Sequence, residues 1–105
     1  MFPTDKAERK RHPVFSGVLS YFPRTMIAMS KCSWVGNEQH NPGQPLHWDR
    51  DKSMDHDDCL IRHMMEGDAI DDDGVPHCVK VAWRANARAE LILEKMAAAG
   101  NPESS

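Results

Sequence analysis

Side chains that can bind a metal ion or move a proton are concentrated in one stretch of this sequence. Residues 37–85 hold five of the six histidines and 11 of the 16 acidic residues, in less than half of the 105-residue chain. Carboxylate and imidazole groups are the usual protein ligands of divalent cations, and carboxylates this close together repel one another unless a cation lies between them. The stretch therefore predicts a divalent metal site and, with it, chemistry on a charged substrate.

One part of the predicted metal site lies on a helix expected over residues 51–66. Asp55 and Asp58 lie one turn apart on one face of that helix, which suits a hard cation such as Mg²⁺ or Mn²⁺. His63 and Glu66, again one turn apart, would add ligands from its end. The alternative is a solvated acidic face, because Asp is favoured near a helix N-terminus. The predicted metal ligands are Asp55, Asp58, His63, Glu66 and Asp71.

The turn after this helix supplies further candidates. Asp71 and His77 follow across the turn, and each is a candidate ligand or proton acceptor. Asp72 and Asp73 are better explained by the turn itself, with Asp73 capping the next helix. The predicted catalytic residues are Asp58, His63 and His77.

Basic side chains on the following helix suit the phosphates of a substrate. His77, Lys80, Arg84 and Arg88 recur at helical spacing and therefore form one stripe. Opposite an acidic helix, such a stripe would hold a triphosphate, with metal on one side and Lys and Arg on the other. The alternative is a solvated basic face that offsets the acids. The predicted phosphate-binding residues are Arg62, Lys80 and Arg84.

The loop expected over residues 37–49 offers groups that suit a nucleobase. A Trp ring beside Asn and His side chains can stack on a base and hydrogen-bond to its edge, although a Trp is more often a core residue. The predicted base-binding residues are His40, Asn41 and Trp48. The sequence has no Ser or Cys in a nucleophile elbow and no phosphate-binding glycine-rich loop. The remaining mechanism is attack by a metal-activated water.

The elements that must position these residues are predicted to be helices. Pro23 is suited to a helix start and Gly36 to its end, residues 51–66 have helical spacing, and a third helix begins after Asp73 and ends near Ala99. In the second helix, Met54, Asp58, Ile61 and Met65 lie on one stripe that would face the core. No segment alternates like a strand. We expect an all-α bundle of three to four helices.

The predicted domain organisation is simple. Residues 1–13 are expected to form a disordered basic arm, residues 14–99 a single all-α domain, and residues 100–105 a disordered tail. A chain of this size has a marginal core, so oligomerisation to a dimer or tetramer is expected to complete it.

Composition narrows the possible partners. The net charge of −3 argues against a stable nucleic-acid complex, and no apolar run could span a membrane or act as a signal peptide. Cytoplasmic residence is expected. The three cysteines show no spacing typical of a disulfide framework or a Cys-based zinc site.

Several motifs together resemble a known family. They are Gly36-Asn37-Glu38-Gln39-His40-Asn41, Leu46-His47-Trp48, Asp58-x-x-x-Arg62-His63, Asp71-x-x-Gly74-x-x-His77 and Ala82-Trp83. In this order they resemble the phage-type dATP/dGTP diphosphohydrolase N-terminal domain, which includes MazZ-type enzymes and is related to the all-α MazG/HisE pyrophosphohydrolases. The resemblance covers roughly residues 18–95. The chain departs from the MazG pattern, since EExxE is absent and only Asp55-x-x-Asp58 echoes the ExxD that follows it.

The resemblance implies a function. It implies hydrolysis of purine deoxynucleoside triphosphates, dATP or dGTP, to the monophosphate and pyrophosphate with Mg²⁺ or Mn²⁺, by an oligomer with active sites between packed helices. Two alternatives stay open. One is an HD-type phosphohydrolase built on His56-Asp57, although adjacent helical residues point about 100° apart. The other is a non-catalytic helical interaction module with a structural metal site.

Overall fold

A computed structural model of the protein describes residues 1–51 and 54–100. Over these residues the fold is all-helical, as predicted, and contains no strand. An isolated antiparallel bridge between Ile70 and Pro76 closes the turn that precedes the last helix. The elements in chain order are α1 (Lys6–Arg9), the π-helical turn η1 (Phe15–Leu19), α2 (Pro23–His40), α3 (His56–Met65) and α4 (His77–Ala98).

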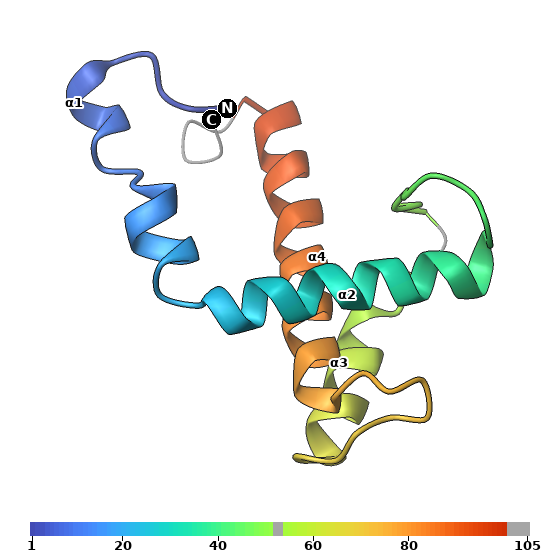
Figure 1. Ribbon diagram of the computed structural model, residues 1–105. Coiled ribbons are helices and arrows are strands. Elements are labelled where there is room, and N and C mark those ends of the chain that lie inside the picture. Colours follow the sequence, from blue (N-terminus) through green and yellow to red (C-terminus); the bar gives the residue numbers. More distant parts are fainter. Residues whose placement is uncertain (52–53, 101–105) are drawn as a thin grey trace.

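Helix α4 is the central element of the fold. It packs against both α3 and α2, and Figure 1 shows α2 crossing α4 while α3 lies alongside its first half. The chain before α2 leads away from these three helices through η1 and α1 (Figure 1). Within residues 1–13, where we expected disorder, α1 forms because Asp5 Oδ2 caps it by accepting from the Glu8 backbone N–H at 2.9 Å.

Helix α2 is longer than the sequence predicted. It continues through Gly36 and ends at His40, so the prediction of Gly36 as its C-terminal cap was wrong. The turn at Asn41, Pro42 and Gly43 ends the helix instead, with Gly43 in the left-handed region at φ 76°. This extension places His40 at the end of the helix and the buried Asn37 in its last turn.

Helix α3 is shorter than predicted, and a different face of it is buried. It begins at His56, so Asp51, Met54 and Asp55, which were expected within it, precede the helix, and the Asp51 backbone N–H donates to Asp49 Oδ1 at 3.1 Å. Residues 52 and 53 of the predicted helix lie outside the described residues. The predicted core stripe of Met54, Asp58, Ile61 and Met65 is solvent-exposed, which corrects that assignment. The residues of α3 that face α4 are His56, Cys59 and His63.

The last helix and the turn before it follow the prediction closely. Gly67 ends α3 at φ 68°, and α4 runs from His77 to Ala98 with Gly100 following at φ 80°. Pro76 takes the N-cap position that we expected for Asp73. The Asp73 carboxylate instead accepts from the Val75 backbone N–H at 3.0 Å within the turn. Asn101 and Pro102, the other predicted stop signals, lie outside the described residues.

The interior is small and unusually polar. The buried hydrophobic residues are Cys59, Val75, Val79 and Ala87, and they are matched in number by the buried polar residues Asn37, His56, His63 and His77. Burying an imidazole costs free energy unless its ring nitrogens find partners. Three buried histidines in so small a core therefore point to a role beyond packing.

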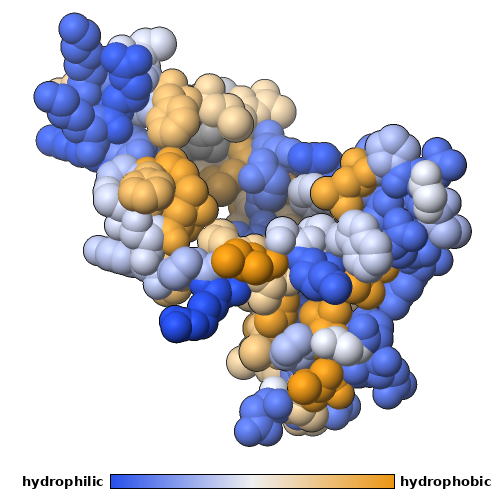
Figure 2. Space-filling model, viewed as in Figure 1, coloured by the Kyte–Doolittle hydropathy of each residue, from blue (hydrophilic) through white to orange (hydrophobic). Residues whose placement is uncertain are grey.

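Large apolar side chains remain at the surface. Figure 2 shows them between polar groups over the centre of the view and at its lower end. On α3 and the turn after it, the exposed members are Ile61, Met64, Met65 and Ile70. No helix within residues 1–51 and 54–100 is both long enough and apolar enough to cross a membrane.

Candidate functional site

A cleft of about 760 Å³ opens between α2, the loop after it, α3 and α4. Helix α2 crosses α4 (Figure 1), and the loop that follows α2 contributes Asn41, Leu46, His47, Trp48 and Asp49 to the lining of the cleft. The buried side chain of Asn37 holds this loop in place. Its Nδ2 donates to the Gln44 carbonyl at 2.9 Å, and its Oδ1 accepts from the His47 backbone N–H at 3.3 Å.

At one end of the cleft three candidate metal ligands converge. His63 comes from α3, Asp71 from the turn and His77 from the first residue of α4, and one donor atom from each lies within 4.8 Å of the others. The two Nδ1 atoms of the histidines are 2.8 Å apart, and Asp71 Oδ2 is 3.9 Å from His77 Nδ1. The turn between α3 and α4 therefore brings together residues that are fourteen positions apart.

The charge states of these groups suit metal binding. Hydrogen bonds from Lys80 and from the Asp72 backbone N–H lower the pKa of Asp71 to about 2, so its carboxylate is ionised at neutral pH. Burial, with the positive charges of Lys80 and Arg62 nearby, lowers the pKa of His63, so this ring is neutral. A neutral imidazole and an ionised carboxylate are the forms that ligate metals.

Lys80 couples this group to a second carboxylate. Its Nζ lies 2.6 Å from Asp71 Oδ2 and 2.7 Å from Asp73 Oδ2, with its side chain largely covered. Burial opposes the charge of Lys80, but the two carboxylates raise its pKa overall. The ammonium group therefore neutralises part of the negative charge that a cation would otherwise meet.

The residues present fit a divalent cation with a small adjustment. Two imidazoles and one carboxylate form a known ligand set for Zn²⁺ and for other first-row transition metals, which leaves further positions open for water and substrate. The 2.8 Å separation of the two Nδ1 atoms is the length of an N–H···N hydrogen bond. Two imidazole nitrogens on a tetrahedral zinc lie roughly 3.4 Å apart, so the rings would part by a few tenths of an ångström.

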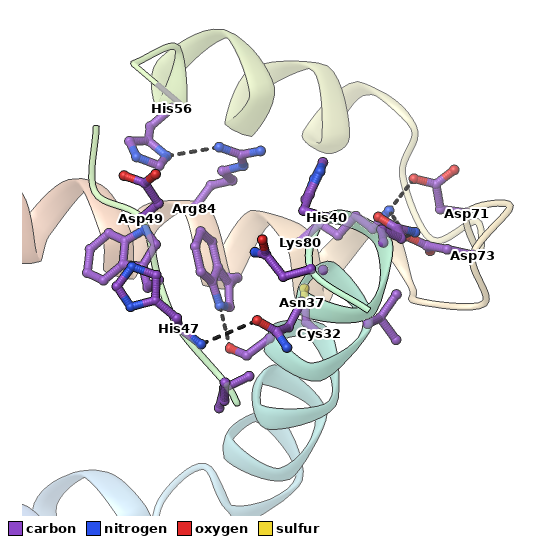
Figure 3. A pocket seen from close by; sticks show the side chains of 18 of the residues that line it. Cys32, Asn37, His40, His47, Asp49, His56, Asp71, Asp73, Lys80 and Arg84 are labelled. Carbon is purple, nitrogen blue, oxygen red and sulfur yellow. Dashed lines mark hydrogen bonds and ion pairs between the residues drawn. The ribbon is translucent and has the colours of Figure 1, made fainter. Parts of the chain in front are cut away.

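At the other end of the cleft lie His56 and two tryptophans. Arg84 donates from its guanidinium to His56 Nδ1 at 3.1 Å, and the ring centroids of Trp48 and Trp83 are 5.8 Å apart, edge to face. Trp83 Nε1 donates to Ser33 Oγ of α2 at 2.8 Å, which fixes its ring. Figure 3 shows His56 and Arg84 at one side of the cleft and Asp71 with Asp73 at the opposite side.

Most of the predicted site residues line this cleft. All three predicted phosphate-binding residues and all three predicted base-binding residues do so, namely Arg62, Lys80, Arg84, His40, Asn41 and Trp48. His63 and Asp71 line it as well, and His77 contacts both of them. Of the predicted basic stripe on α4, Lys80 and Arg84 line the cleft, His77 lies beside it in contact with His63, and Arg88 pairs with the exposed Asp57 at 2.7 Å.

Three predicted metal ligands lie outside the group. Asp58 and Glu66 are exposed on α3, and neither belongs to the His63, Asp71 and His77 group. Asp55, also exposed, accepts from Cys59 Sγ at 3.5 Å, and this contact lowers its pKa. The orientation of α3 turns His56 and His63 toward α4 and Asp58 outward, while Asp55 and Glu66 lie at the exposed N-cap and C-cap positions of the helix.

The sequence analysis missed several residues that shape the cleft. Asn37 was not singled out for its structural role, and Trp83 and His56 were not assigned to the site. The usable signal was the spacing of His56 and His63, which lie seven residues apart and therefore share a helix face. His56 and Asp57 of the HD-type alternative lie in different surroundings, since His56 is buried and lines the cleft, whereas Asp57 is exposed and pairs with Arg88.

Comparison with known proteins adds no assignment. No protein-family model matches the chain, and neither does any curated protein or any solved structure. The geometry of the cleft is therefore the basis for any functional conclusion.

Proposed function

We propose that the protein is a metal-dependent hydrolase of nucleoside triphosphates that releases pyrophosphate and the monophosphate. The observation that carries the proposal is the composition of the single cleft described above. One end gathers His63, Asp71 and His77, basic side chains line its wall, and two tryptophans lie at the other end. A triphosphate needs a cation and basic groups, and a base needs a flat apolar surface.

The choice of purine deoxynucleotides rests on the family resemblance. The Arg62-His63 and Gly74-x-x-His77 motifs that carry this resemblance lie at the metal-binding end of the cleft. The dATP/dGTP specificity, the MazG-like fold and a place in the nucleotide metabolism of a phage-infected cell, in the cytoplasm, are part of the proposal on that ground. The geometry itself supports the reaction class.

The chain's own residues have distinct tasks in this proposal. His63, Asp71 and His77 would hold the cation, which would supply an acidified water for hydrolysis; as that water adds to phosphorus, the P–O bond between the monophosphate and pyrophosphate groups breaks. Arg62, Lys80 and Arg84 line the cleft and would bind the phosphate oxygens that gain charge during the reaction. The imidazole ligands favour Mn²⁺ or Zn²⁺ over Mg²⁺, which prefers an all-oxygen shell.

A product assay tests the proposal directly. Metal-free protein is mixed with each dNTP and with Mg²⁺, Mn²⁺ or Zn²⁺ in turn, and phosphate, pyrophosphate and triphosphate are quantified. The expected product is pyrophosphate, with dATP or dGTP as the best substrate. Release of phosphate or triphosphate would replace the proposed reaction with another hydrolysis, and no turnover of any dNTP by folded, metal-loaded protein would overturn it.

A structural metal site is the second candidate, and one observation favours it. The three candidate ligands come from α3, the turn and α4, and a bound ion would therefore join elements that share only a small core. Chelation would then lower the melting temperature by several degrees, as loss of a structural zinc does. A catalytic site would lose turnover on chelation with a smaller change in melting temperature.

We infer that a second copy of the chain covers the exposed apolar face of α3. The face consists of Ile61, Met64 and Met65, and the few buried hydrophobic residues leave a single chain with a marginal core. Light scattering should give a mass above the 11.9 kDa of one chain. Ile61→Arg should shift it toward the monomer, whereas Ala97→Arg on α4 should not. A monomeric wild type at high concentration would contradict this inference.

A further inference from the structure

His56 carries a buried ring nitrogen with no partner. The residue is 6% exposed and lines the cleft. Its Nε2 atom is the only fully buried side-chain nitrogen or oxygen, among residues 1–51 and 54–100, that lacks a hydrogen-bond partner. Such a group costs free energy in the folded protein, so its presence at a cleft wall requires an explanation.

The contact with Arg84 fixes what the free nitrogen can do. A guanidinium group only donates hydrogen bonds, so His56 Nδ1, 3.1 Å from Arg84, must accept. The proton of the neutral ring is therefore on Nε2. Burial and the charge of Arg84 both lower the pKa of His56, which keeps the ring neutral. His56 thus offers one unused N–H donor.

The surroundings of this donor suit a flat ring better than a phosphate, because the carboxylate of Asp49 offsets the charge of Arg84, which hydrogen-bonds His56. The Trp83 ring centroid is 6.5 Å from that of His56 and 5.8 Å from that of Trp48. Asp49, which also lines the cleft, is drawn at the His56 end in Figure 3, and its carboxylate would repel a phosphate. The cationic Lys80 with Asp71 lies at the opposite side of the same view.

We propose that His56 Nε2–H, which neighbouring side chains cover in this structure, becomes accessible when they move apart and then donates a hydrogen bond to an acceptor atom on the edge of a nucleobase that binds against Trp48 and Trp83. The acceptor is a ring nitrogen or a carbonyl oxygen. This inference rests on the proposed function, because it takes the ligand of the cleft to be a nucleotide. It assigns the two ends of the cleft: the base lies at His56, and the phosphates lie at His63, Asp71 and Lys80.

The experiment measures binding without turnover. Deoxyguanosine, deoxyadenosine and inorganic tripolyphosphate are titrated into wild-type protein and into His56→Phe, followed by tryptophan fluorescence and by calorimetry. Phe keeps a flat ring and removes the donor. We expect His56→Phe to bind the nucleosides roughly tenfold more weakly, the loss expected for one hydrogen bond in a desolvated site. Tripolyphosphate should bind at least as well as in wild type, because Arg84 loses its hydrogen bond to His56 and is free to pair with phosphate. His12→Phe, outside the cleft, should change neither affinity.

Two further measurements separate this role from a structural one. His56→Phe should melt within a few degrees of wild type, because removal of the unsatisfied buried Nε2 donor offsets the loss of the hydrogen bond from Arg84 to Nδ1. A structural histidine would lose stability instead. In the wild type, the Nε2–H proton resonance of His56 should shift downfield on nucleoside binding, a test that needs no variant.

The possible outcomes are distinct from those of the hydrolysis assay. Equal nucleoside affinity in wild type and His56→Phe, no nucleoside binding at all, or a loss confined to tripolyphosphate would each overturn the base-reading role. Hydrolysis of dNTPs could still be observed in those cases. Conversely, nucleoside binding that depends on His56, with no pyrophosphate released, would support this inference and refute the proposed reaction.

Discussion

His63 Nδ1 and His77 Nδ1 lie 2.8 Å apart, although the two residues belong to different helices and both are buried. One ring must donate its Nδ1 proton to the other, since two lone pairs at this distance would repel. Asp71 lies beside the pair, 3.9 Å from His77 Nδ1. A divalent cation that replaced the shared proton would bind both nitrogens and the carboxylate.

Replacing His77 with Ala should therefore abolish tight metal binding. Metal-free wild type and His77→Ala are titrated with Zn²⁺ or Mn²⁺ in a calorimeter. The variant should bind the cation roughly 100-fold or more weakly, because it has lost one of three ligands. His12→Ala is the matched control, because His12 is exposed and its ring contacts only the Glu8 carbonyl. Equal affinities in His77→Ala and wild type would contradict the assigned site.

The sequence predicted the helices well because their signals are local. Pro23 at a helix start, Gly67 at a helix end and the break before α4 each act within a few residues, and no tertiary contact was needed to interpret them. Gly36 misled the prediction because a single glycine is tolerated inside a helix that tertiary contacts support. Here Asn37, the next residue, is buried and holds the following loop.

The face of α3 that is buried could not be predicted in the same way. Apolar Ile61 and Met65 share a stripe with Asp58, and hydrophobicity alone favours that stripe as the core. The structure buries the stripe of His56, Cys59 and His63 instead, because the two histidines find partners in Arg84 and His77 on α4. Hydrogen-bond partners from another helix leave no signal in the pattern of α3 itself.

A pair of acidic variants should distinguish the two possible metal sites. Asp58→Asn and Glu66→Gln should leave metal affinity and turnover within about twofold of wild type, since exposed surface substitutions have small effects. Asp71→Asn should lose both. Asp73→Asn is the control for Asp71, because Asp73 also accepts from Lys80, at 2.7 Å, but lies outside the candidate metal group. A large loss of metal affinity and turnover in Asp58→Asn would instead indicate that the metal binds at the acidic face of α3.

The stability of the metal-free protein should fall as the pH falls through the histidine range. Burial lowers the pKa of both His56 and His63 below the ordinary value of 6.5. The unfolded state then binds more protons than the folded state, so the free energy of unfolding decreases as pH drops below about 6.5. The shift of Asp71 acts only at much lower pH, near its pKa of about 2. Urea unfolding between pH 8 and pH 5 measures the effect.

Two variants identify the source of this pH dependence. His63→Phe should flatten the profile between pH 7 and pH 5, because it removes one of the two shifted groups. His12→Phe should leave the profile unchanged, since His12 is exposed. If the free energy of unfolding of the wild type stays constant or rises as the pH falls from 7 to 5, the neutral state assigned to His56 and His63 is contradicted.

Lys80→Met should change metal binding and phosphate binding in opposite directions. The ammonium group contacts Asp71 at 2.6 Å, and its charge also helps to lower the pKa of His63. Removing this charge should raise the affinity of the site for a divalent cation severalfold, because the ammonium group no longer competes for the Asp71 carboxylate. It should weaken tripolyphosphate binding about tenfold, because a charged hydrogen-bond donor is lost.

Arg88→Met is the control, since Arg88 pairs with exposed Asp57. Calorimetric titrations with Mn²⁺ and then with tripolyphosphate measure both effects, and a parallel loss of both affinities would show that Lys80 supports the fold of the site rather than competing for Asp71.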